Sequence, residues 1–306
     1  MLIFYESLIF RIYRNCLKPL GRFKLKRLYK RGLPEQIFIP LRFLFKKSLS
    51  DEDIKVFSKV ENIREQVANS VTLFTPIMMN HRLERTASEI AMESSVSPEW
   101  GMFLYLCAKS FQARTVLELG SSAGISGCYL ASAPSCRKFI TIEGSPTLAR
   151  LAEHNICQVN TQSHVINGRF DEVIGDVLDN LTDQIDLVYI DGPKTQTETL
   201  HLFSLIVPKL SNISIVIFDD ITWSKDMWKL WKAVCDWDGL AYAINTGRFG
   251  VCLWCGDKKQ SVKVDLSLLT GWLRIKNIFE LKLLSKFKIL TLKNKRNESK
   301  EPSRNI

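Results

Sequence analysis

Between Arg114 and Trp254, short runs rich in Val, Ile and Leu alternate with runs of helical spacing. The apolar runs are nearly continuous, which is typical of strands that are buried on both faces. This alternation predicts a parallel, doubly wound sheet with right-handed crossovers. Only a glycine-containing turn separates the last two strand runs, LAYAINTG and FGVCLW, so we expect them to pair antiparallel. The predicted fold class is therefore α/β, with a doubly wound seven-stranded sheet that is mostly parallel and has an antiparallel last strand.

Charge is spread unevenly along the chain. Residues 1–50 carry a net charge of +10 and residues 257–306 carry +8, whereas the middle of the chain carries −8. We predict a basic amphipathic N-terminal segment over 1–50 and a helical lid or cap region over 51–113. A cofactor-binding domain follows over 114–256, and a basic amphipathic helix with a disordered tail over 257–306.

The two basic arms favour anionic partners, namely membrane lipid, nucleic acid or an acidic protein. In the first arm Phe4, Leu8 and Ile12 fall at helical spacing among basic residues, as in helices that lie at a membrane interface. The same pattern fits a helical cap that packs on the domain, or on a second copy of the chain in a homodimer. Both interpretations stay open. Nucleic acid is not favoured, because no nucleic-acid-binding module is recognised.

The sequence favours a cytoplasmic protein. No apolar run approaches the roughly 20 residues that span a bilayer, and the apolar start MLIFYESLIF is interrupted by Glu6 and lacks a small-residue cleavage site. Most of the eight cysteines lie in apolar runs, and the pair Cys252 and Cys255 has no partner pair at zinc-site spacing. We expect reduced thiols. Peripheral contact with the inner membrane surface through the arms is a further expectation.

A glycine-rich turn follows the first predicted strand, Thr115–Leu119. Gly120, Gly124 and Gly127 have the spacing G-x-x-x-G-x-x-G, which differs from the G-x-G-x-x-G of dinucleotide sites. Glu118 stands at the end of the strand, where its charge would repel a pyrophosphate. A carboxylate in this place suits a positively charged ligand, such as the amino group of a methionine moiety.

The second predicted strand ends in Glu143, in the sequence TIEGSP. An acid in this place can accept hydrogen bonds from both hydroxyls of a ribose. Alternatively, it is an acid at the start of the helix that begins near Ser145. With the glycine turn, Glu143 predicts a nucleoside-type cofactor.

The segments ELGSSAGIS and TIEGSP resemble class I S-adenosylmethionine-dependent methyltransferases of the catechol and caffeoyl-CoA O-methyltransferase-like group, in an uncharacterised bacterial branch. VSPEWGMFLYL, FDEVI, YIDG, FDDITWSKDMW and GRFGVCLW extend the resemblance from about Ser97 to Trp254. It implies a Rossmann-like fold, S-adenosyl-L-methionine as cofactor and methyl transfer to an oxygen. It does not cover the basic arms.

The resemblance also implies which residues contact the cofactor. The glycine loop and Glu118 would hold the methionine end, Glu143 the ribose, and the segment Gly168–Asp171 would lie by the adenine. Phe170 departs from the family, which often has Ser or Ala there. The expected set is Glu118, Gly120, Ser122, Gly124, Ser126, Glu143, Gly144, Arg169, Phe170 and Asp191.

Carboxylates also end the fourth and fifth predicted strands, at Asp191 and at Asp219 and Asp220. Because parallel strands end at one edge of the sheet, these acids should converge, and a hard divalent ion such as Mg²⁺ would relieve their repulsion. The resemblance agrees, and it places a proton-accepting lysine at Lys194. The hypothesis is that Asp191, Asp219 and Asp220 bind Mg²⁺ or a similar cation. The cation would chelate the hydroxyl of a small phenolic or catechol-like acceptor, while Lys194 takes the proton if burial and metal lower its pKa.

Other interpretations compete with this one. Asp191 could orient a loop, and the Asp pair could cap the following helix. The chain could methylate a macromolecule or a lipid-linked acceptor through its arms, but no Asn/Asp-Pro-Pro-Tyr-type motif follows the fourth strand. A non-catalytic, membrane-docked scaffold is disfavoured because the acids and Lys194 are retained. His81 and Arg82 in the lid region are further candidates for acceptor contact.

Overall fold

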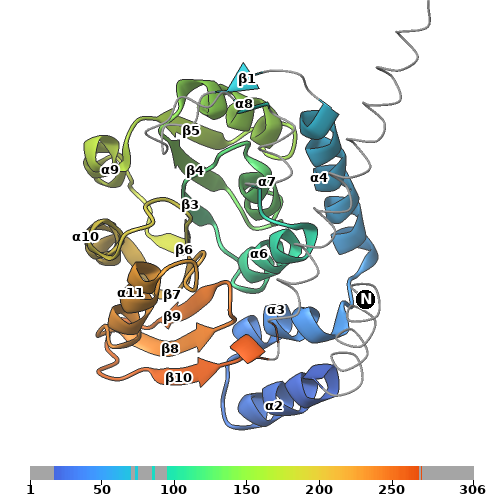
Figure 1. Cartoon of the computed structure of the whole chain (residues 1–306), viewed down its shortest axis with the longest axis vertical. Coiled ribbons are helices and arrows are strands. Elements are labelled where there is room, and N and C mark those ends of the chain that lie inside the picture. Colours follow the sequence, from blue (N-terminus) through green and yellow to red (C-terminus); the bar gives the residue numbers. More distant parts are fainter. Residues whose placement is uncertain (1–16, 70–72, 75–84, 87–94, 269, 271–306) are drawn as a thin grey trace, which may run out of the picture.

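The computed structural model describes residues 17–69, 73–74, 85–86, 95–268 and 270. Its centre is an eight-stranded sheet with the strand order β10-β8-β9-β7-β6-β3-β4-β5 (Figure 1). The strands are β3 (Thr115–Leu119), β4 (Lys138–Glu143), β5 (Ser163–Asn167), β6 (Ile185–Ile190), β7 (Leu210–Phe218), β8 (Leu240–Asn245), β9 (Gly250–Trp254) and β10 (Val262–Asp265). A separate short pair is formed by β1 (Leu73–Phe74) and β2 (Arg85–Thr86).

The strand directions confirm the doubly wound α/β prediction. Every neighbouring pair in the large sheet is parallel except the two pairs made by β9, which lies antiparallel to both β7 and β8. The chain runs outward from β3 to β4 and β5, and then returns to β6 on the other side of β3. This reversal between β3 and β6 is the switch point at which open α/β sheets bind ligands.

The number of strands differs from the prediction, because β10 adds an eighth. Within residues 257–306, where we predicted a basic amphipathic helix and a disordered tail, Val262–Asp265 instead pairs parallel with β8. The alternation in VKVD explains this, since Val264 is buried while its neighbours are exposed, which is a strand pattern of period two. Most of the predicted helix, residues 271–292, lies outside the described residues.

Helices cover both faces of the sheet (Figure 1). One face packs against α6 (Pro98–Ser110), α7 (Ile125–Ala131) and α8 (Pro146–Cys157), and the other against α9 (Phe170–Asp179), α10 (Gln196–Ile206) and α11 (Lys225–Cys235). Side-chain caps start three of these helices, because the hydroxyls of Ser145, Thr195 and Ser224 accept hydrogen bonds from backbone amides three residues later.

Three further helices precede the sheet, namely α2 (Lys18–Lys30), α3 (Glu35–Lys46) and α4 (Asp51–Asn69). Helix α3 buries Ile37, Leu41 and Leu44 in the core that it shares with α6 and α7. The packed-cap interpretation therefore holds for α3. The division of the chain into four regions stays a prediction, and residues 1–16 lie outside the described part.

Helix α4 is fixed at its start by a reciprocal cap. The amide of Ser50 donates to the Asp53 carboxylate, and the amide of Asp53 donates to the Ser50 hydroxyl. Asp53 also accepts hydrogen bonds from Tyr105 at 3.0 Å and Lys109 at 2.6 Å, which ties α4 to α6. None of the helices in the described ranges is both long and apolar enough to cross a membrane.

Candidate active site

The glycine loop joins β3 to α7 at the switch point. Gly120 has φ +94°, and a Cβ there would lie 2.5 Å from the carbonyl oxygen of Asp191. Gly124 has φ +79°, and its Cβ would lie 2.8 Å from the Cα of Ala152. Both positions therefore require glycine, for backbone conformation and for space. The loop is seated against the end of β6 on one side and against α8 on the other.

Glu143 lies at the end of β4, beside this loop. Its carboxylate accepts one hydrogen bond from the amide of Ser122 at 2.8 Å and one from the amide of Ser145 at 2.9 Å. Burial raises its pKa, against the effect of these amides. The amide of Gly144 also acts on this carboxylate, so backbone amides use part of its roughly four acceptor sites and the remainder can accept from a ribose hydroxyl. This donor and acceptor pattern fits the nucleoside part of S-adenosylmethionine.

Glu118 is fully buried in β3, beneath α7. Neither of its carboxylate oxygens has a hydrogen-bond partner within the described part of the chain. Burial raises its pKa to about 8, although the nearby hydroxyls of Ser126 and Thr141 lower it. A Cβ on Gly127 would lie 3.1 Å from one of its oxygens, so the carboxylate points under the helix. Direct contact with the methionine end of a cofactor, which we predicted, does not fit this buried position.

Of the remaining predicted cofactor residues, Phe170, Ser126 and Gly144 lie near the glycine loop or the strand ends, whereas Arg169 makes its ion pairs within its own helix. Phe170 packs on Gly192, the residue after Asp191, because a Cβ on that glycine would lie 2.7 Å from the ring. Ser126 is buried in α7, and the Gly144 carbonyl accepts a hydrogen bond from Asn167. Arg169 is not brought to the loop by its contacts. It is exposed and pairs with Asp171 and Glu172 on its own helix.

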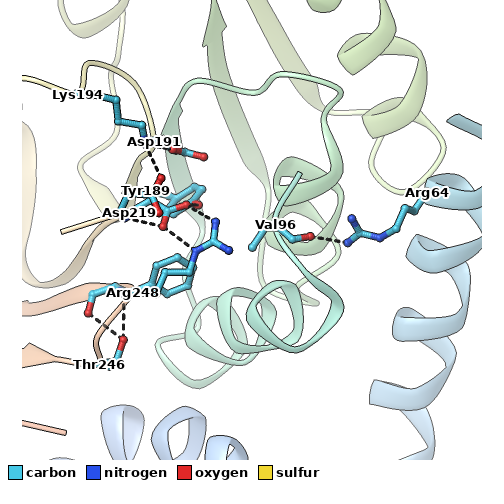
Figure 2. Close-up of polar contacts among 10 residues, drawn as sticks. Arg64, Val96, Tyr189, Asp191, Lys194, Asp219, Thr246 and Arg248 are labelled. Carbon is cyan, nitrogen blue, oxygen red and sulfur yellow. Dashed lines mark hydrogen bonds and ion pairs between the residues drawn. The ribbon is translucent and has the colours of Figure 1, made fainter. Parts of the chain in front are cut away.

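The acids that end β6 and β7 meet as predicted. One oxygen from each of Asp191, Asp219 and Asp220 lies within 4.8 Å of the others. Lys194, which lies beside Asp191 in Figure 2, bridges two of them. Its Nζ is 2.6 Å from Asp191 and 3.2 Å from Asp220. The Asp191, Lys194 and Asp220 side chains each keep about a quarter of their surface exposed. These three groups can therefore reach a molecule bound at this edge.

Lys194 was predicted to accept a proton, which requires a neutral amine, but its surroundings favour the charged ammonium form. Burial would lower its pKa, but Asp191, Asp219 and Asp220 outweigh this effect and raise it above the ordinary value. Burial also raises the pKa of Asp191. Lys194 opposes this rise, and the two neighbouring carboxylates add to it. In this arrangement Lys194 is an ammonium group and does not accept a proton. Asp191, whose pKa is raised, is the better proton acceptor of the two.

Asp219 is held in a different way from the other two acids. It is paired with Arg248, which donates from Nε to Oδ1 and from Nη2 to Oδ2, both at 2.8 Å. The Tyr189 hydroxyl donates to Oδ2 at 2.7 Å, and the amide of Asp220 donates to Oδ1 at 2.6 Å. Although burial opposes it, the pairing with Arg248 holds the pKa of Asp219 at about 2. These contacts do not fit the metal-ligand role that we predicted for Asp219, since all four of its acceptor sites are in use.

Sequence reasoning did not assign a role to Arg248 or Tyr189. Arg248 lies just before β9, and the pairing of Phe218 with Gly250 brings it beside the end of β7. The backbone fixes it there, because the amide of Ile221 donates to its carbonyl at 3.1 Å. The sequence did contain a signal for Arg248, because this arginine directly precedes the run FGVCLW, which was predicted to be an antiparallel strand. It could be used only after β9 was known to pair with β7.

The comparisons with known proteins agree with this geometry. A family model described as a methyltransferase domain matches residues 117–221, from the middle of β3 to just beyond β7. Over these residues the chain is similar to the methyltransferase domain family. The domain is 34% identical over 103 residues to a catechol O-methyltransferase of Niastella koreensis, which covers 33% of this chain and 47% of that protein. A catechol O-methyltransferase of Mycobacterium tuberculosis is 36% identical over 105 residues, covering 33% and 46%.

The chain thus spans about half the length of the curated relatives that it matches. Among solved structures, an O-methyltransferase from Bacillus cereus in complex with SAH superposes with a TM-score of 0.49 at 19% identity, covering 64% of this chain and 89% of that one. His81 and Arg82, the further candidates for acceptor contact in the lid region, lie outside the described residues.

Proposed function

We propose that the chain is an S-adenosylmethionine-dependent O-methyltransferase that acts on a small hydroxylated acceptor of phenolic or catechol-like type. One observation carries the proposal, namely the position of the glycine loop of the methyltransferase domain. The loop is bonded to Glu143 on one side and packs on Asp191 on the other. A nucleoside site at the end of β4 and a proton-transfer site at the end of β6 thus lie on either side of the loop that follows β3, as methyl transfer to a hydroxyl requires.

The cofactor end is built from the loop, Glu143 and Phe170. The remaining acceptor capacity of Glu143 suits a ribose hydroxyl, and the ring of Phe170 offers an apolar surface for the base. When bound, S-adenosylmethionine supplies the activated methyl group. Similarity to catechol O-methyltransferases supports this assignment for the third of the chain that is aligned.

The acceptor end is built from Asp191, Lys194 and Asp220. A hydroxyl must lose its proton as its oxygen becomes nucleophilic, and Asp191 is the group that would take it. Lys194 holds Asp191 and Asp220 in place and keeps its own charge. This revises the role predicted for Lys194, from proton acceptor to positioning residue. The proposal includes no divalent ion, because the contacts of Asp219 do not fit one.

The test is calorimetric titration of the full chain with S-adenosylmethionine, followed by mass spectrometry of a panel of phenols and catechols incubated with protein and cofactor. Glu143→Gln should weaken cofactor binding by about tenfold or more, since a lost hydrogen bond to a charged group costs roughly 1.5–3 kcal/mol. Glu153→Gln is the matched control, because Glu153 is an exposed acid on α8. Asp191→Asn should abolish product formation.

Failure to bind S-adenosylmethionine would overturn the cofactor assignment. Cofactor binding without any methylated phenol or catechol would overturn the acceptor class. Equal affinity in Glu143→Gln and Glu153→Gln would overturn the role given to Glu143.

A further inference from the structure

Asp219 is the acid of the cluster with the most complete set of partners. Its side chain has no exposed surface, and the guanidinium of Arg248 meets it edge-on with two parallel hydrogen bonds (Figure 2). Tyr189 and the amide of Asp220 supply two more donors. A carboxylate has about four lone-pair sites, so a ligand bond from Asp219 to a metal ion would require at least one of these donors to leave.

Arg248 is itself held in place by several contacts. Its carbonyl accepts from Ile221, and the Thr222 hydroxyl donates to the Gly247 carbonyl at 2.6 Å, so the loops after β7 and before β9 are joined. The guanidinium also lies 5.4 Å from the centre of the Phe249 ring. Moving Arg248 away would break a bidentate pair and leave a buried acid without its cation, which is strongly unfavourable.

The charges in the cluster are already largely balanced. Three carboxylates face two cations, Arg248 on Asp219 and Lys194 on Asp191 and Asp220. Mg²⁺ needs open carboxylate oxygens in near-octahedral geometry and gives up its water reluctantly. The repulsion that predicted a divalent ion in the sequence is therefore relieved by side chains of the chain itself.

We propose that Arg248 occupies the place of a divalent cation in this site, so that Asp219 binds no metal and methyl transfer proceeds without one. Arg248 is then a positioning residue, which fixes Asp219 and, through it, the loop that carries Asp220. Its side chain keeps 23% of its surface exposed, whereas that of Asp219 is completely covered. The inference about the reaction rests on the proposed function, but the inference about metal binding does not.

The test is binding of Mn²⁺ to the full chain, followed by water-proton relaxation, which needs neither cofactor nor acceptor. The wild type should show no saturable site at millimolar Mn²⁺, and Asp219→Asn should not change this. Arg248→Met should open Asp219 and create one site per chain. The double variant Arg248→Met with Asp219→Asn should lose that site again.

Arg64→Met is the matched control, because Arg64 is another partly buried arginine, bonded to Glu61 and to the Val96 carbonyl at 2.7 Å (Figure 2). It should gain no Mn²⁺ site. Where an acceptor has been found, turnover should be equal with and without a chelator.

Saturable Mn²⁺ binding by the wild type that Asp219→Asn removes would overturn the proposal, whatever the activity. A folded Arg248→Met that gains no site would show that Arg248 does not exclude the metal, and would overturn it too. If Arg248→Met does not fold, as judged by circular dichroism, the comparison of wild type with Asp219→Asn decides alone.

Discussion

Two non-glycine residues of the site have positive φ angles, Ser122 at 48° and Asp220 at 54°. Such conformations cost on the order of 1–3 kcal/mol and persist where the surroundings enforce them. Each one aims a backbone amide at a carboxylate, Ser122 at Glu143 and Asp220 at Asp219. The strained backbone at these two residues thus orients the acids at two strand ends.

The buried carboxyl of Glu118 gives a prediction about pH. Its pKa is raised from 4.5 to about 8, mainly by burial, so the folded state binds the proton more tightly than the unfolded chain does. Its contribution to stability is fully present below about pH 4.5 and is lost as the pH rises through about 8. Glu118→Gln removes this dependence, and should therefore unfold at a higher urea concentration than wild type at about pH 8.5, with a smaller difference at about pH 5.

Urea unfolding of both proteins at the two pH values measures this difference, with Glu153→Gln as the exposed control. Equal pH profiles for wild type and Glu118→Gln would mean that Glu118 is not buried as described.

The sequence predicted the acids of the site because a residue at the end of a strand lies at the ligand-binding edge whatever the order of the strands. Glu143, Asp191, Asp219 and Asp220 were found in this way. Their partners could not be found by the same rule, because the pairing of Asp219 with Arg248 depends on which strand is inserted beside β7. The charge state of Lys194 likewise depends on its distances to the carboxylates of Asp191 and Asp220, which cannot be read from its spacing in the sequence.

At the scale of elements, helix α2 exposes large apolar side chains that a binding partner could cover. It has no acid, and it exposes 53% of Leu20 and 67% of Phe23 beside Lys24 and Arg27. These four residues line a surface groove of about 630 Å³ that is completed by Asp265, Leu266 and Leu268 (Figure 1 shows α2 beside β10). Exposed apolar groups surrounded by basic ones suit an anionic lipid surface.

We therefore expect the full chain to float with vesicles that contain anionic lipid, and not with neutral vesicles. Each basic residue near such a surface contributes about 1 kcal/mol, so replacing Lys24 and Arg27 by Ser should lower the affinity roughly 30-fold. Phe23→Ser should weaken binding, whereas Ile213→Ser, which removes a similarly exposed residue from β7, should not. Binding to neutral vesicles, or an equal loss in Ile213→Ser, would contradict this docking surface.

At the scale of the whole molecule, the N-terminal basic segment is divided between surface and core. The sequence showed apolar residues mixed with lysine and arginine across residues 1–50, and composition alone could not separate a membrane helix from a packed one. The structure separates the two described helices, because α3 buries one face against α6 while α2 keeps several apolar side chains exposed. The difference between α2 and α3 comes from long-range packing against the rest of the domain, which a local sequence pattern does not reveal.

This division predicts unequal effects on stability. Leu44→Ala should lower the free energy of unfolding by about 2–5 kcal/mol, because Leu44 is completely buried in the main core. Leu20→Ala should change it by no more than about 0.5 kcal/mol, because Leu20 is half exposed. Thermal and urea unfolding of the full chain measure both. Equal losses would contradict the placement of α3 in the core.

The position of β9 has a consequence for how the protein is made. A chain is synthesised from its amino terminus and folds as it emerges, so the strands that carry Glu143, Asp191 and Asp219 are available before Arg248 leaves the ribosome. Until β9 inserts between β7 and β8, the nascent domain contains Asp191, Asp219 and Asp220 but lacks Arg248. During this time a divalent ion can reach Asp219. The insertion of β9 therefore also ends the interval in which the nascent protein can trap a metal.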